Sequence, residues 1–452
     1  MAASSEPSPP PERISAARLA CWLAPPQAAS VPDRAARIRA AIAVAIVFAG
    51  KAAGALLLLA PWDLEASEWR FGYEAGHIAA NLAAGHGFSI AVGPEHFIPT
   101  AWMSPAYPLL LAGMFRAFGA FSSEAAHAAV LANCLFQGLT AGLLFLLGVR
   151  WGGRRAGLVT VALFVVNPGG WQFLDWAWPT HLFALAILAH LHALARAPGD
   201  AARAGARCGA TLGLALLVDG AAIALLPVTA LSLALSARRG RTAPALLVAG
   251  LALALVLAPW GVRNQRVLGT ANPLRGNVGV NLWLGNHPGA RAESFHGIRL
   301  SPWHDRAEGQ RMVELGETAY DRAARERALA RFLERPGEFL ANSAMRFSGF
   351  WLAEWWVGWG HIPAIYTLGH VALTALAAVG AWRSRRAGTG FLVVALLLFA
   401  LPYALTVHGH GRYRVPVEPI LCLLGALGIA GASPGGAATA PAGAAPPDRA
   451  RR

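Results

Sequence analysis

The sequence predicts an all-α polytopic membrane protein with about ten (roughly 9–11) membrane-spanning helices. Hydrophobic residues make up 56% of the 452 residues, whereas charged residues make up only 14%. The mean hydropathy is +0.45, and long apolar runs alternate with clusters of arginine. Because a soluble domain carries about 25% charged residues, this composition excludes the ordinary soluble classes.

The formal net charge of +14 comes almost entirely from arginine, since Lys51 is the only lysine. In a membrane protein such an excess marks cytoplasmic loops, so it requires no nucleic-acid partner and we expect none. The four cysteines are scattered and form no Cys-x-x-Cys motif, so no disulfide framework is predicted.

The two ends of the chain differ from its centre. Residues 1–37 are rich in Pro, Ser and Ala and lack the basic-then-apolar order of a signal peptide, so we expect a disordered cytoplasmic tail. Residues 433–452 have a similar low-complexity composition, so we expect them to form a disordered tail as well. Residues 38–432 between them are predicted to form the transmembrane domain.

Arginines set the expected orientation of the spans. Arg34, Arg37 and Arg39 precede the first span, about 40–59, which places the N-terminus in the cytoplasm. Further arginine clusters divide the later apolar runs, which we assign as spans near 124–149, 156–168, 179–195, 242–260, 362–382, 388–407 and 414–432.

Two apolar segments are short for a full crossing, which takes about 20 residues. The run 208–237 lies between two arginine clusters and must cross and return, so we predict a broken hairpin with its break at Asp219-Gly220. The segment 105–119 contains Arg116, and we interpret it as a re-entrant or interfacial helix.

On this topology, most of the polar residues outside the arginine clusters lie on the outer side. A first outer loop covers about 61–123, a short loop covers 169–178, and a large outer loop covers about 261–361. The sequence of the large loop predicts a helix that extends to about Glu334 and is broken at Arg335-Pro336. It is too small for a separate catalytic domain, so we expect any chemistry at the membrane boundary.

Acidic residues follow the first span directly. Glu74 opens the helical pattern EAGHIAANLAAG, where an acid also complements the helix dipole. Such a carboxylate can act as general base on an acceptor or help to hold a divalent metal, or it can be an exposed loop charge. Other candidate acids on the outer side are Asp63, Glu65, Glu68 and, within WQFLDWAWPTH, Asp175.

The stretch HGHGRYRVPVEP (408–419) places arginines on the outer side, against the positive-inside preference. Arg412 and Arg414, with Tyr413 between them, suit a phosphate or diphosphate, because arginine binds such groups bidentately. His408 and His410 can add donors.

Further candidates would line a substrate groove. Lys51 lies within the first span, where a charge marks a functional site or snorkels to the surface. The exit from the 242–260 span carries Arg263, followed by an Asn- and Gly-rich stretch that suits either carbohydrate contact or turns. The groove candidates besides Lys51 are Trp102, Tyr107, Trp178, Asn281 and Trp283, with Arg263 assigned to the donor phosphate.

These motifs resemble those of the GT-C superfamily of polytopic glycosyltransferases, in particular the family 39 group of protein mannosyltransferases and the aminoarabinose transferase of lipid A. The resembling stretches, in order, are GYEAGHIAANLAAGHGFS, PTAWMSPAYPLLLAG, PWGVRN and HGRYRVPVEP. The likeness extends over about 38–432.

The resemblance implies a GT-C-like bundle in the plasma (inner) membrane, with an extracytoplasmic or periplasmic active face. It implies a polyprenyl-phosphate-linked sugar as donor and inversion at the anomeric carbon. The sugar, the divalent-metal requirement and the acceptor (protein, lipid or cell-wall glycan) stay open.

The resemblance also implies roles for single residues. The catalytic acid of the first outer loop corresponds to Glu74; the Asp-Glu pair that usually opens this helix is absent, and Phe71-Gly72 occupy about its place. Glu68 and Asp63 are therefore alternatives. Asp175 resembles the second acid, and the HGRYR arginines resemble the donor-phosphate ligands.

Two other classes fit parts of the pattern. A transporter or lipid flippase would need inverted repeats and charges near the midplane of the bilayer, but only Lys51 and Asp219 are candidates for such charges. A non-catalytic membrane scaffold is the third reading, and the missing Asp-Glu pair is in its favour.

Overall fold

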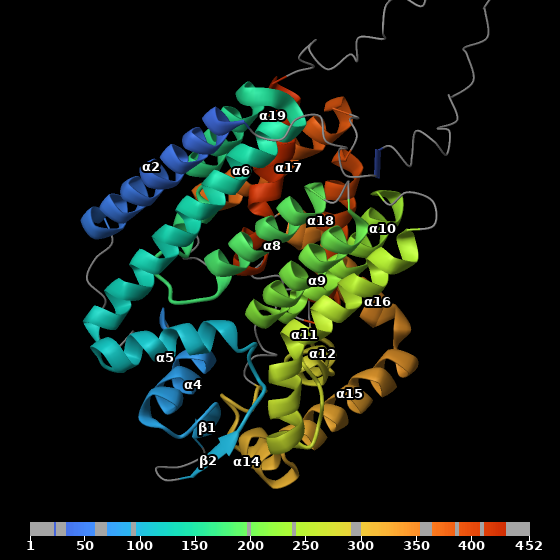
Figure 1. Ribbon diagram of the computed structural model, residues 1–452. Coiled ribbons are helices and arrows are strands. Elements are labelled where there is room, and N and C mark those ends of the chain that lie inside the picture. The colour runs from blue at the N-terminus through green and yellow to red at the C-terminus, as the bar shows by residue number, and fades with distance from the viewer. Residues whose placement is uncertain are drawn as a thin grey trace, which may run out of the picture.

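The computed structural model shows a bundle of helices with short helices and loops gathered at one end (Figure 1). Within the described residues, seven helices are long and apolar enough to cross a membrane, and three shorter apolar helical segments accompany them. These observations confirm the predicted all-α, multi-pass membrane fold. The structure describes residues 22–23, 33–58, 70–91, 96–196, 200–236, 241–290, 300–352, 364–384, 388–406 and 411–430.

Two ends of the bundle can be distinguished. The loop end carries the short helices and strands, and the opposite end, which we call the arginine end, carries the chain reversal within residues 123–166 that holds Arg150, Arg154 and Arg155 (Figure 1). The helices of the bundle are α2 (Arg34–Leu58), α6 (Ser123–Val166), α8 (Thr180–Ala195), α9 (Ala201–Val218), α10 (Leu226–Ser236), α11 (Thr242–Leu268), α17 (Ala364–Ser384), α18 (Thr389–Thr406) and α19 (Glu418–Ala430).

The 44-residue helix α6 contains a reversal of the chain. Gly153 adopts φ 78°, a conformation that glycine tolerates best. Beyond it, Gly157 packs against Gly148 and the Phe145 carbonyl, whereas residues 145 and 157 would lie about 18 Å apart in a straight helix. The predicted spans 124–149 and 156–168 are therefore two helices joined by the arginine-bearing turn.

The predicted break at Asp219-Gly220 is confirmed, but the prediction of two short halves needs correction. Helix α9 begins at Ala201, where Asp200 caps its N-terminus, and it reaches 18 residues. The sequence pattern hid this length because Arg203 and Arg207 lie in its first two turns. After Asp219, a 3₁₀ segment (η2, Gly220–Leu225) leads into α10.

The loop end is built from short elements. Helix α5, which covers the predicted short segment 105–119, packs on α4 through Phe71, Tyr107 and Phe115. In the large loop, one helix ends at Glu334 and the next begins at Pro336, as predicted. The elements of this end are α4 (Glu74–Ala84), β1 (Ser89–Ala91), β2 (Phe97–Pro99), α5 (Ala106–Phe118), α7 (Gly169–Gln172), α12 (Val278–Asn286), α14 (Arg306–Leu315), α15 (Glu317–Glu334), α16 (Pro336–Leu352), η3 (Gly411–Tyr413) and η4 (Val415–Val417).

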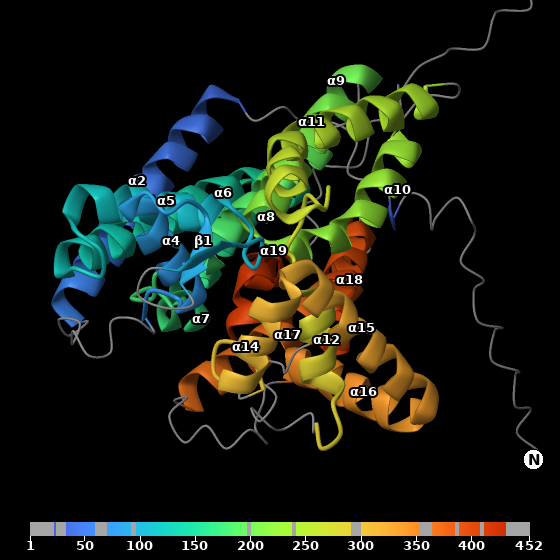
Figure 2. The same ribbon diagram turned by 90° about the horizontal axis from the view of Figure 1, so that it is seen from below.

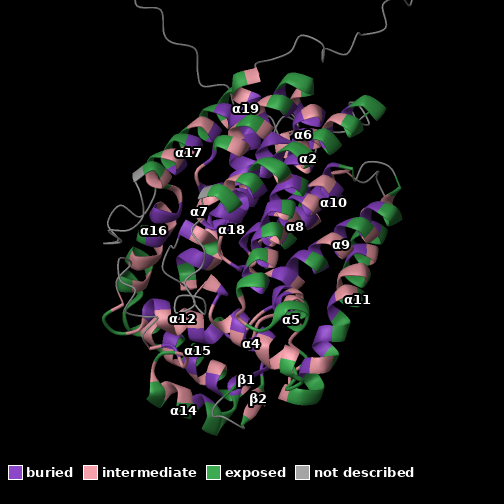
Figure 3. Cartoon of the chain, turned by 90° about the vertical axis from the view of Figure 1, so that its left-hand side faces the viewer, coloured by how far each residue is buried: buried purple, intermediate pink, exposed green. Residues whose placement is uncertain are grey.

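Viewed from the loop end, the helices form three groups around α8 and α19 (Figure 2). The outer sides of the bundle are exposed (Figure 3), and on α11 they carry Leu247, Leu251 and Leu255. An apolar exposed surface of this kind is suited to lipid contact.

Helices α9 and α11 pack closely through small residues. A Cβ atom at Gly205 or Gly209 would overlap the carbonyl oxygen of Ala245 or Ala249 on α11. This Gly-x-x-x-Gly spacing places both glycines on one face and lets the two backbones approach.

We expect Gly209→Ala to destabilise the bundle by about 1–3 kcal/mol, because the new methyl group has no room. Gly250→Ala is the matched control, since a Cβ atom there meets nothing within 4 Å, and it should gain up to about 1 kcal/mol of helix propensity. The measurement is the thermal unfolding midpoint of each variant in detergent. Equal midpoints would contradict the close packing.

Candidate active site

The first loop approaches the bundle through an unusual backbone turn. Gly72 (φ 72°) and Tyr73 (φ 33°) both have positive φ directly before α4. A Cβ atom at Gly72 would overlap the indole of Trp178, and Phe71 beside it is completely buried. Phe71-Gly72 therefore anchor the loop on the bundle and place Glu74 at its edge.

A cleft with about 590 Å³ of empty volume, part of it open to solvent, lies at this edge. It brings together segments that are far apart in the sequence: the first loop, the start of α8, the break after α9, the end of α18 and the HGRYR stretch. Its lining includes Glu74, Met103, Trp178, Asp219, Arg275, Tyr403, Arg412 and Tyr413.

Arg412 is held in the cleft by aromatic rings. Its guanidinium lies 4.3 Å from the centre of the Trp178 ring, and its Nη2 donates a hydrogen bond of 2.7 Å to the Tyr413 hydroxyl. Tyr413 in turn stacks on Tyr403 at 4.6 Å. Glu74 and Asp219 are the carboxylates whose charges act on this guanidinium. This arrangement places a fixed cation, which can bind an anionic group, next to two carboxylates, which can accept a proton.

Asp219 and Arg275 are cleft residues that the sequence analysis did not assign to the site. Arg275 Nη1 lies 3.8 Å from Asp219 Oδ2, and Arg275 Nε donates to the Trp102 carbonyl at 3.2 Å. Asp219 also caps the 3₁₀ segment by accepting from the Ala221 amide. The available signal was an acid at the break of an apolar hairpin.

Arg414 lies on the other side of its segment from Arg412 and does not line the cleft. It is 5% exposed, and its Nε lies 4.0 Å from the Glu418 carboxylate. Glu418 also accepts a hydrogen bond of 2.5 Å from Asn167 and lies 3.2 Å from His370 Nδ1. Arg414 thus joins a buried network that fixes the segment carrying Arg412.

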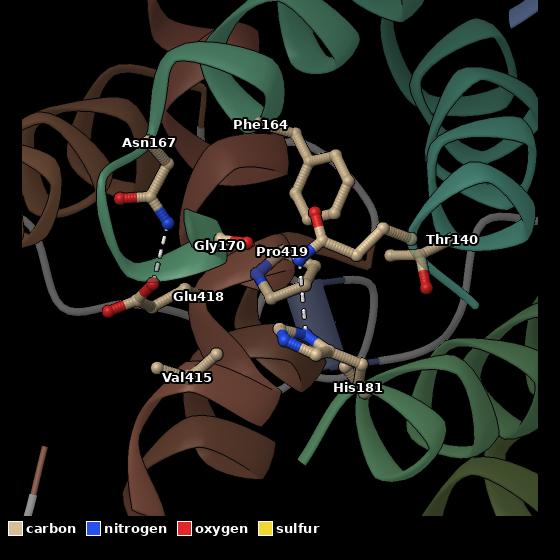
Figure 4. A pocket seen from close by; sticks show the side chains of 10 residues that line it. Thr140, Phe164, Asn167, Gly170, His181, Val415, Glu418 and Pro419 are labelled. Atoms are coloured by element: carbon tan, nitrogen blue, oxygen red, sulfur yellow. Dashed lines mark hydrogen bonds between the residues drawn. The ribbon is translucent and has the colours of Figure 1, made fainter. Parts of the chain in front are cut away.

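This network borders a second, smaller cavity with about 260 Å³ of empty volume, lined from α6, α7, α8 and α19 (Figure 4). Gln137 donates to the Gly170 carbonyl and lies 3.2 Å from His181 Nδ1. Lys51 reaches the same carbonyl at 3.4 Å and lies 3.6 Å from the centre of the Trp171 ring. Lys51 is thus part of the buried framework beside this cavity, outside the cleft lining.

Asp175 forms an ion pair with Arg70, with 2.7 Å between Oδ2 and Nη1. Burial raises the pKa of this carboxyl, although Arg70 opposes the shift. The Arg70 carbonyl also accepts from the Ala177 amide at 2.7 Å. Asp175 does not line the cleft; its position ties the 169–178 loop to the first loop.

The other predicted residues have packing roles in the structure. Arg263 donates to the carbonyls of Thr100 and Phe88 at 2.6 and 2.7 Å. Trp102 and Tyr107 are buried. Asn281 and Trp283 lie on α12, where the Trp283 ring faces Arg327 at 4.8 Å.

Some predicted residues lie outside the described part of the chain, namely His408, His410, Asp63, Glu65 and Glu68. Among the described residues, no group of three or more His, Cys, Asp or Glu side chains is arranged to hold a metal ion.

A buried carboxylate connects the large loop to the wall of the cleft. Glu317 of α15 accepts hydrogen bonds from the Thr100 hydroxyl and from the Ala101 amide, the latter at 2.8 Å. The Ala101 carbonyl accepts from the Gly276 amide at 2.8 Å, next to Arg275. Burial raises the pKa of Glu317 from 4.5 to about 7.

Comparisons with known proteins give only remote likenesses. No family model and no curated protein matches the sequence. A structure of ArnT from Cupriavidus metallidurans bound to undecaprenyl phosphate matches with a TM-score of 0.46 and 13% identity, over 78% of this chain and 54% of that one. The oligosaccharyltransferase of Archaeoglobus fulgidus, in its apo form, matches with a TM-score of 0.46 and 14% identity, over 86% of this chain and 50% of that one.

This chain therefore spans about half the length of the two solved proteins.

The raised pKa of Glu317 predicts a stability that depends on pH. Because the folded-state pKa of about 7 exceeds the ordinary 4.5, the neutral carboxyl favours the folded state, and this contribution is lost as pH rises through about 7. We expect the thermal midpoint to fall between about pH 4.5 and pH 7, and Glu317→Gln to flatten that decrease. The exposed Glu326→Gln is the control, and an unchanged slope in Glu317→Gln would contradict the assignment.

Proposed function

We propose that the protein is an integral-membrane glycosyltransferase that moves a sugar from a polyprenyl-phosphate donor to an acceptor at the loop end. The observation that carries the proposal is the cleft itself, because it joins a carboxylate from the first loop to two arginines from distant segments. A lipid-phosphate sugar needs cations at its phosphate and a base near its anomeric carbon.

In this proposal, Arg412 and Arg275 bind the donor phosphate. The rings that flank Arg412 fix its guanidinium before the donor arrives, so little side-chain freedom is lost on binding. Arg275 exchanges part of its contact with Asp219 for the phosphate. Arg414 takes no phosphate role here, because it is already paired with Glu418.

Glu74 acts as the general base. It accepts the proton of the acceptor hydroxyl or amine as the acceptor attacks the anomeric carbon. The bond from that carbon to the phosphate oxygen breaks, and the arginines neutralise the charge that develops on the leaving polyprenyl phosphate. A single displacement of this kind inverts the anomeric configuration.

The orientation follows from the arginines. The turn within α6, which carries Arg150, Arg154 and Arg155, lies at the end of the bundle opposite the short helices and strands of the loop end (Figure 1). By the positive-inside preference, the loop end then faces the extracytoplasmic or periplasmic side of the plasma (inner) membrane.

The proposal predicts different losses for its two central residues. In detergent, we expect Arg412→Gln to weaken binding of labelled polyprenyl-phosphate sugars by about tenfold to hundredfold, because a charge-assisted contact is lost. Glu74→Gln should keep binding but slow hydrolysis of the donor by about 10²–10⁴-fold, because the base is lost.

The matched controls are Arg322→Gln and Glu326→Gln, which alter exposed residues of α15. Both should bind and turn over the donor like the wild type. If the wild type binds none of a panel of polyprenyl-phosphate sugars, the transferase proposal fails, and solute or lipid flux in vesicles would then test the transporter alternative.

A further inference from the structure

Arg150, at the turn of α6, is largely buried and has no counter-ion among the described residues. It is only 8% exposed. Its Nε is buried without a hydrogen-bond partner, and no described side chain or backbone group forms a hydrogen bond or ion pair with its guanidinium. Its two terminal nitrogens are not among the buried atoms that lack a partner, so they are accessible to a ligand.

The neighbours of Arg150 add positive charge. The charge of Arg196 acts on Arg150, and the charges of Arg150, Arg196 and Arg207 all act on the His192 imidazole. Arg207 Nη2 also donates to the Arg196 carbonyl at 2.9 Å. We refer to Arg150, His192, Arg196 and Arg207 as the Arg150 cluster.

The described part of the chain does not balance this charge. The nearby acid in the sequence, Asp200, lies 3.5 Å from Arg203 Nε and caps α9. The C-terminal dipole of α8 can explain why Arg196 and Arg207 lie at that helix end. It does not explain Arg150, which belongs to α6 and donates to no carbonyl.

We propose that the Arg150 cluster binds a phosphate group, supplied by the headgroup of an anionic phospholipid. Guanidiniums bind phosphate oxygens bidentately, and basic pockets between membrane helices suit anionic headgroups. The cluster lies where α6 turns and α8 ends, and none of its residues lines the cleft. It therefore does not depend on the proposed transferase activity.

The test compares the full-length protein in detergent with three additives: phosphatidylglycerol, phosphatidylcholine and inorganic phosphate. We expect phosphatidylglycerol to raise the thermal midpoint and phosphatidylcholine to leave it unchanged. Arg150→Gln should weaken the phosphatidylglycerol affinity by about tenfold or more. Without added lipid, the same variant should be at least as stable as the wild type, because the repulsion between Arg150 and Arg196 is removed.

Arg203→Gln is the matched control, because Arg203 is an exposed arginine of the same end with its own carboxylate partner; it should keep the lipid response. If Arg150→Gln does not fold, Arg196→Gln, which alters an exposed side chain, should show the same loss. A response to inorganic phosphate alone supports the phosphate site and overturns the lipid source. Equal responses to the two lipids, or a full response in both variants, would overturn the proposal.

Discussion

The buried carboxylate of Glu418 is the constraint on which the arrangement of the cleft depends. It lies at the first position of α19, where it contacts Asn167 of the α6–α7 connection, His370 of α17 and Arg414 of its own segment. A carboxylate that is 2% exposed is tolerated only with such partners, and breaking a buried pair costs about 3–5 kcal/mol. Residues 411–417 before α19 are thereby fixed in one orientation, with Arg414 in the buried network and Arg412 at the cleft.

The same constraint explains why two arginines separated by one residue have different roles. Arg414 pairs with the buried carboxylate of Glu418. Arg412 instead lies over the Trp178 ring and donates a hydrogen bond to the Tyr413 hydroxyl. The Trp178 ring and the Tyr413 hydroxyl hold the Arg412 guanidinium at the cleft, where Glu74 and Asp219 are the acids that act on it. Arg412 therefore lines the cleft, whereas Arg414 does not.

The two ends of the bundle carry different sets of polar groups. At the loop end, the first loop is fastened to the bundle by the Asp175–Arg70 ion pair and to the large loop by Glu317. At the arginine end, the Arg150 cluster lacks any described acid. Between them, helices approach each other through small residues, as in the contact of α9 with α11. Close backbone packing replaces the hydrophobic driving force that is absent between helices in lipid.

The sequence by itself determined the spans, the breaks and the residue types of the site. Apolar length and arginine position depend on composition over a window, so the division between the spans 124–149 and 156–168 and the break at Asp219 could be predicted. Glu74 could be chosen because it opens a helical pattern after the first span, and Arg412 and Arg414 because arginines on the outer side oppose the positive-inside preference. Only the tertiary structure decided which charges face each other, because pairing joins segments far apart in the chain. In the folded chain, Asp219 and Arg275 line the cleft. Arg414 pairs with Glu418 and Asp175 pairs with Arg70, both outside the cleft lining.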